Sequence, residues 1–67
     1  MRETKQDILE KQREALKQEI STLDQTIIDM EAMGRAGRVN MDQLQSLKTA
    51  RATRQRELND VLARLAQ

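Results

Sequence analysis

The chain has 67 residues, a net charge of +1, and no cysteine, histidine, proline or aromatic residue. This length allows one small domain, over residues 1–67, and a chain this short buries only a modest share of its surface. The missing residue types exclude disulfides, thiol chemistry and the commonest zinc ligands, so we expect no metal, no cofactor and no bound small molecule.

Charge is distributed unevenly along the chain. Residues 1–33 carry five basic and eight acidic side chains, net −3, and residues 34–67 carry seven basic and three acidic ones, net +4. The two halves are therefore electrostatically complementary. No apolar run approaches the roughly 18 residues of a membrane span, and the N-terminal stretch MRETKQDILEKQ lacks the apolar core of a signal peptide. We expect a cytoplasmic protein that contacts no membrane.

The first half has the apolar pattern of one long helix. Leu9, Leu16, Leu23 and Met30 recur every seven residues, and Ile20 and Ile27 between them give the 4-3-4-3 spacing of a coiled-coil seam. Because proline is absent, nothing breaks this helix before Gly34. The pattern predicts a helix over about residues 3–33, ended by Gly34 in the left-handed conformation.

The segment over residues 34–40 contains both glycines and predicts a turn. Asn40 is a good N-cap, and Gln43 three residues later completes a capping-box pattern. Val39 and Leu44 flank the cap in the positions of a hydrophobic staple. Together these signals favour a closed turn over two straightened chains that pair as extended helices.

The second half predicts a helix over about residues 41–66. The same spacing continues there at Leu44, Leu47, Leu58, Val61 and Leu65, with Arg51 and Arg54 at the two middle positions. Folding the chain about Gly37 pairs residues whose numbers add to about 74. The prediction is therefore an all-α, antiparallel two-helix hairpin of coiled-coil type.

This register gives the two seam arginines acidic neighbours. Arg51 falls opposite Leu23, with Asp24 within reach of Arg51 and Lys48. Arg54 falls opposite Ile20, between Glu19 and Glu57. We therefore expect a central polar layer, which consists of Glu19, Asp24, Arg51 and Arg54.

Two helices cannot enclose the whole apolar face, since Ala15, Ala50 and several larger side chains widen it beyond the seam. We expect the hairpin to complete a helical bundle, either with another protein or as a homo-oligomer, with a dimeric four-helix bundle as the first hypothesis. The candidate partner surface consists of Ile8, Ile28, Met33, Arg35, Arg38, Met41 and Leu62. The methionines near the turn fit either helix-end packing or an adaptable docking point.

The function predicted is non-enzymatic protein–protein interaction, in assembly, adaptor or regulatory work. No His, Cys or Tyr is present to act as base or nucleophile, so we expect no catalysis. The GRAGR segment, residues 34–38, lacks the Lys-Ser/Thr ending of a phosphate-binding loop. Nucleic-acid binding through the basic second helix is an alternative, although no aromatic residue is available to stack on bases.

In length and layout, the predicted hairpin resembles the small co-chaperones of type III secretion needle subunits. That resemblance implies a second alternative, a small chaperone or inhibitor held by a specific larger partner. A family of short hairpin phosphatases carries a Ser-Gln-Glu-Leu-Asp signature on its second helix. The corresponding stretch here, residues 55–59, reads QRELN and lacks the terminal acid, which excludes that family.

Overall fold

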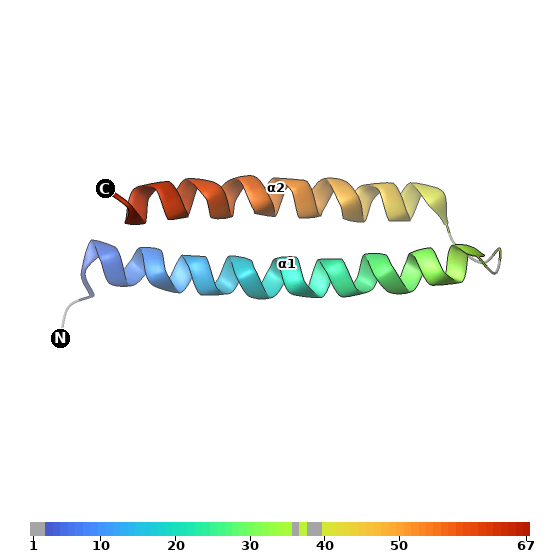
Figure 1. Ribbon diagram of the computed structural model, residues 1–67, viewed down its shortest axis with the longest axis horizontal. Helices are drawn as coiled ribbons and strands as arrows, with labels where there is room; N and C mark the ends of the chain where they lie inside the picture. Colours follow the sequence, from blue (N-terminus) through green and yellow to red (C-terminus); the bar gives the residue numbers. More distant parts are fainter. Residues whose placement is uncertain (1–2, 36, 38–39) are drawn as a thin grey trace.

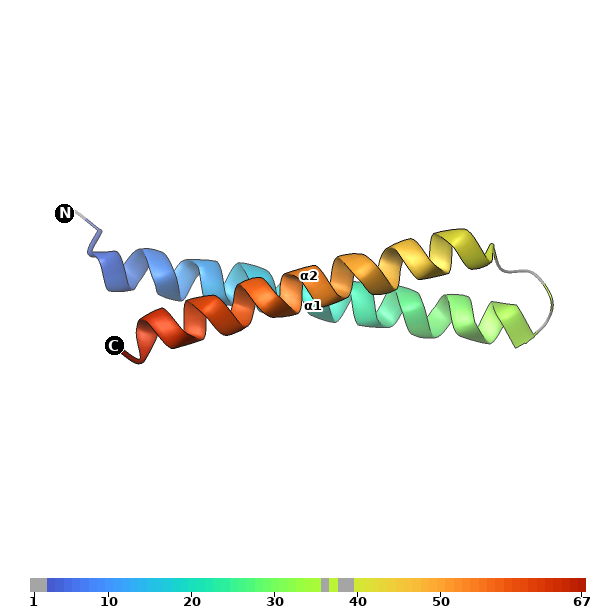
Figure 2. The ribbon, with the colours of Figure 1, turned by 90° about the horizontal axis from the view of Figure 1, so that it is seen from above.

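The protein is a hairpin of two long antiparallel helices (Figure 1). The computed structural model describes residues 3–35, 37 and 40–67, leaving aside the side chain of Arg35. Helix α1 spans Lys5–Arg35 with 31 residues, and α2 spans Met41–Leu65 with 25 residues. The hairpin measures 52 × 20 × 14 Å, and its helices cross at a shallow angle near their middles (Figure 2). The predicted all-α hairpin is confirmed.

Helix α1 begins two residues later than the sequence pattern predicts, because a capping interaction sets its first turn. The backbone N–H of Asp7 donates to Thr4 Oγ1 at 3.1 Å, and the N–H of Thr4 donates to Asp7 Oδ2 at 3.2 Å. This reciprocal pair satisfies two N–H groups that have no partner within the helix. Thr4 is therefore the N-cap, and Lys5 is the first helical residue.

The end of α1 corrects the prediction for Gly34. Gly34 lies inside the helix, which continues to Arg35, and the glycine with a positive φ is Gly37 at 75°. The N–H of Gly37 donates to the carbonyl oxygen of Gly34 at 2.9 Å, which closes the last turn in the manner of a glycine C-cap. A glycine inside a helix costs stability but does not oblige the helix to end, so α1 runs on to the second glycine.

Helix α2 starts at the predicted cap. Asn40 has extended backbone angles, and its side-chain oxygen accepts from the N–H groups of Asp42 at 2.9 Å and Gln43 at 3.2 Å. Val39 lies outside the described residues, so the predicted staple to Leu44 is not described. The helix ends at Leu65, one residue before the predicted end, with Ala66 as its C-cap.

The core is a single seam between the helices, and a cluster of buried side chains lies next to the turn. Ile27, Met30 and Leu44 form a buried cluster against which Leu47 packs, and Leu44 is only 5% exposed. The predicted register pairs Met30 with Leu44 and Ile27 with Leu47, and all four side chains lie together in this cluster. All buried side chains of the described residues belong to the predicted seam: Ile20, Ile27, Met30, Leu44, Leu58 and Val61. The other seam positions are half-buried: Leu9, Leu16, Leu23, Leu47 and Leu65.

The two glycines should respond to alanine with opposite signs. A Cβ at Gly37 meets nothing within 4 Å, so Gly37→Ala loses about 1–2 kcal/mol through its left-handed backbone alone. Gly34→Ala should gain up to about 1 kcal/mol, because alanine is the better helix former. Urea unfolding monitored by circular dichroism measures both changes. Equal destabilisation by the two variants would mean that the helix ends at Gly34 instead.

Truncation of seam leucines should measure how burial varies along the hairpin. Leu44→Ala should cost about 2–4 kcal/mol because it opens a cavity in the buried cluster. Leu9→Ala, at the open end where the side chain is half-buried, should cost about 1 kcal/mol. Thermal and urea unfolding compare the two variants. Similar losses at both positions would contradict the deeper burial of Leu44.

Candidate interaction surface

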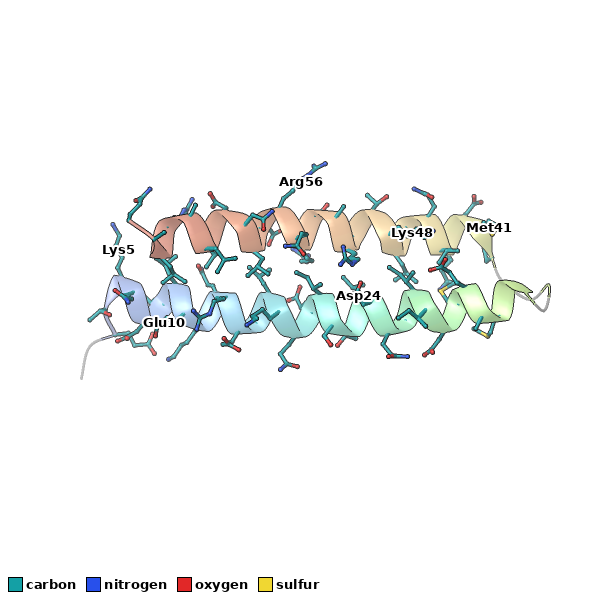
Figure 3. The ribbon with its side chains drawn as sticks, viewed as in Figure 1. Lys5, Glu10, Asp24, Met41, Lys48 and Arg56 are labelled. Atoms are coloured by element: carbon teal, nitrogen blue, oxygen red, sulfur yellow. The ribbon has the colours of Figure 1, made fainter. Side chains whose placement is uncertain are left out.

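A layer of ion pairs crosses the middle of the seam. Asp24 lies between the helices (Figure 3), and its carboxylate forms an ion pair with Arg51 Nε. A second, longer contact joins Arg51 Nη2 to Asp24 Oδ2 at 3.5 Å. Of the two cations predicted within reach of Asp24, Arg51 is the one that makes this bond.

The second arginine of the layer bridges both helices. Arg54 Nε lies 2.9 Å from a carboxylate oxygen of Glu19 on α1, and its Nη1 lies 2.6 Å from a carboxylate oxygen of Glu57 on α2. The predicted position of Arg54 between two carboxylates is therefore observed. Two adjacent seam positions of α2 are thus basic, and each reaches an acidic group of α1.

The layer stays in contact with solvent, which limits what it adds to stability. Its arginine, aspartate and glutamate side chains are each between 39% and 55% exposed. Ion pairs at this level of exposure contribute little net free energy. The layer gives each of the two half-exposed guanidinium groups in the seam a carboxylate partner.

Asp24 also affects the protonation of its partner. Its hydrogen bond and its negative charge both raise the pKa of Arg51 above the ordinary arginine value. A raised pKa favours the folded state at every pH below the ordinary value. That contribution is lost only as the pH rises through the raised value, far above the physiological range. Arg51 is therefore a constant positive charge in the seam.

The exposed large apolar side chains of the described residues coincide with the predicted partner surface. They are Ile8, Ile28, Met33, Met41 and Leu62, with exposed fractions of 44%, 59%, 48%, 66% and 43%. The side chain of Arg35 and the whole of Arg38 lie outside the described residues. The apolar part of the predicted surface is thus solvent-exposed, as its role requires.

These apolar side chains do not form one continuous patch, because the hairpin has two flanks. Ile28 and Gln55 line a groove on one side of the seam, together with Lys17, Ile20, Ser21, Asp24, Gln25 and Leu58. Glu19 and Glu57 line a groove on the other side, together with Gln12, Ala15, Leu16, Asp60, Val61 and Arg64. We call these the Ile28 flank and the Glu57 flank.

Heptad spacing assigns the exposed apolar residues to the two flanks, with Ile8 one heptad from Ala15 and therefore on the Glu57 flank. Met41 and Leu62 lie two and one heptads from Gln55, so they share the Ile28 flank. Met33 lies two heptads from Glu19, so it belongs to the Glu57 flank. Sequence reasoning treated all of these residues as one surface. The signal that separates them is their heptad position on either side of the seam.

The described part of the chain has no group of three or more His, Cys, Asp or Glu side chains placed to hold a metal ion. Within the same residues, neither helix combines the length and the apolar character that crossing a membrane requires. Comparisons of this chain with protein-family models, with curated proteins and with solved structures found no match.

A double-mutant cycle tests the central layer. Asp24→Asn and Arg51→Gln should each destabilise the hairpin slightly, and their combination should cost less than the two losses added together, because both remove one interaction. The coupling should shrink between 0.1 M and 1 M NaCl, since salt screens an exposed pair. Urea unfolding of all four proteins at both salt concentrations gives the coupling. Strict additivity at low salt would mean that the two groups do not interact.

Proposed function

We propose that this protein is a non-enzymatic interaction module that covers its exposed apolar flanks by packing against another helical protein surface. Its mode of action is association, and no step of chemistry is assigned to it. The apolar side chains on its flanks supply the contact area. The ion pairs of the central layer hold the two helices in the register that presents them.

The observation that carries the proposal is the amount of surface left exposed. The hairpin exposes 5411 Å², whereas a compact folded monomer of 7.8 kDa exposes about 4,400 Å². The excess, about 1,000 Å², slightly exceeds the roughly 800 Å² that each partner buries in a standard protein interface. An elongated partner that lies along one flank would restore an ordinary ratio of surface to volume.

Nucleic-acid binding through α2 has less support. Three of the four arginines of α2 pair with carboxylates: Arg51, Arg54 and Arg64. These pairs reduce the positive charge that α2 offers to a phosphate backbone. A polyanion would also have to lie near the carboxylates of Glu19, Glu57 and Asp60, which repel it.

The molecule that packs on these flanks is either a second copy of the chain or a specific larger protein, as in the co-chaperone layout. Both occupants use the same exposed apolar side chains, so one experiment covers them. A photo-crosslinking amino acid at Met41 or Ile28, introduced in the cells from which the gene comes, should yield covalent adducts with a protein. The same group at Arg56, a charged side chain that projects away from α1 (Figure 3), is the control.

The result expected is strong adducts at the two apolar positions and few at Arg56. The mass of each adduct then tells a second copy of the chain from a different protein. An absence of adducts at both apolar positions, with the protein present and helical, would overturn the proposed function.

A further inference from the structure

Helix α2 carries a second regular stripe beside its seam. This stripe, here called the α2 strip, follows the same 4-3-4-3 spacing and consists of Met41, Gln45, Lys48, Ala52, Gln55, Asn59 and Leu62. Gln55 is half-buried and the others are exposed. The strip holds one charged residue, Lys48, in a chain of which 34% is charged.

The strip lies on the Ile28 flank. Gln55 lines the groove there with Ile28, and Met41, Lys48 and Leu62 lie at heptad spacing from Gln55 on the same side of α2. The other three, Gln45, Ala52 and Asn59, follow Met41, Lys48 and Gln55 by four residues, and residues four apart are neighbours on a helix surface. Gln55 Nε2 donates to Asn59 Oδ1 at 3.1 Å, which holds two of the amide side chains in place. The other ends of these amides are polar groups that a partner surface can satisfy.

Residue types in the strip match from both ends, except that Lys48 corresponds to Gln55. When a second strip runs antiparallel about Ala52, Met41 meets Leu62, Gln45 meets Asn59, and Lys48 meets Gln55, so that each pair of numbers adds to 103 or 104. The apolar ends meet each other, the amides of Gln45 and Asn59 meet, the ammonium group of Lys48 meets the amide of Gln55, and no like charges of the two strips face each other. A surface that is complementary to itself in this way is what a twofold symmetric interface requires.

We propose that the occupant of the Ile28 flank is a second copy of this chain, packed α2 against α2 in antiparallel orientation with the twofold axis at Ala52. This inference rests on the proposed function and names its partner. Ala52 sits at the centre of the strip, and its small side chain lets two helix backbones approach closely. Met41 and Leu62 close the two ends of the interface, about 30 Å apart along α2.

The charge of Lys48 favours the antiparallel orientation over the parallel one. In a parallel pair of strips, Lys48 of each copy would face Lys48 of the other. The strip contains no acidic side chain that could offset the repulsion between these two ammonium groups. In the antiparallel pair, Lys48 faces the neutral amide of Gln55. The exposed surface is also large enough for a dimer interface. Each chain exposes about 1,000 Å² more than a compact monomer of its mass, and each partner in a standard interface buries roughly 800 Å².

Disulfide trapping tests the geometry, and it is clean because the chain contains no cysteine. Ala52→Cys should form a covalent dimer rapidly under mild oxidation, because the two sulfurs meet on the axis. The matched control is Thr53→Cys, which is exposed at the same level of α2 and lies one heptad from Asp60 on the Glu57 flank. Thr53→Cys should give little covalent dimer at the same protein concentration.

A pair of end substitutions tests the orientation. Met41→Cys/Leu62→Cys should cross-link between chains, whereas either single variant should not, because residue 41 of one copy meets residue 62 of the other. Efficient cross-linking of Met41→Cys alone would indicate a parallel arrangement and would overturn the inference.

Sedimentation of the intact protein provides the second measurement. Ala52→Arg places two guanidinium groups on the axis and should shift the protein from dimer to monomer, with the helical circular dichroism signal retained because Ala52 is exposed. Thr53→Arg should remain dimeric. A wild-type dimer that survives Ala52→Arg and is not trapped by Ala52→Cys overturns this interface but leaves the proposed function standing. If the wild-type protein is a monomer and all its photo-adducts contain another protein, the α2–α2 interface is likewise overturned and the proposed function stands.

Discussion

The structure depends on the register in which the two helices meet. That register is set next to the turn, where Ile27, Met30 and Leu44 form a buried cluster and Leu47 packs against it. The connection is short and capped on both sides, by Gly37 after α1 and by Asn40 before α2. A heptad slip would separate both apolar pairs and both seam arginines from their partners, so each part of the hairpin supports the same alignment.

The central layer explains why the core is uneven. Arg51 and Arg54 occupy positions where a coiled coil ordinarily places apolar side chains, and they reach outward to carboxylates that remain hydrated. The apolar seam is therefore interrupted between the cluster at the turn and the leucines toward the open end. This arrangement contributes less free energy than a continuous seam. In return, it ties the register to specific charges.

A hairpin of two helices cannot bury all of the apolar surface that its helices carry. Each helix buries only the stripe that faces its neighbour, and both flanks of the seam stay open to water. Both flanks hold an ion pair of the central layer and exposed apolar side chains, Met33 among them on the Glu57 flank. The Ile28 flank has three such apolar side chains, Ile28, Met41 and Leu62, and a strip on α2 with one charged residue. The Glu57 flank has two carboxylates, of Glu19 and Glu57, around Arg54. The two flanks are thus chemically different. That difference is the reason to assign association to one of them.

The sequence by itself determined the helices, the antiparallel register and the ion-pair layer, because these follow from local spacing: heptads, an Asn40 cap and charges placed opposite each other. It misplaced the end of α1, since either glycine can end a helix and only the surrounding turn selects Gly37. The Thr4–Asp7 cap carried a readable signal, a threonine followed three residues later by an acid. Only the tertiary structure decided which seam leucines stay half-exposed and how the outer apolar residues divide between two flanks. Burial depends on how closely two helices approach at each level, which no single helix's pattern contains.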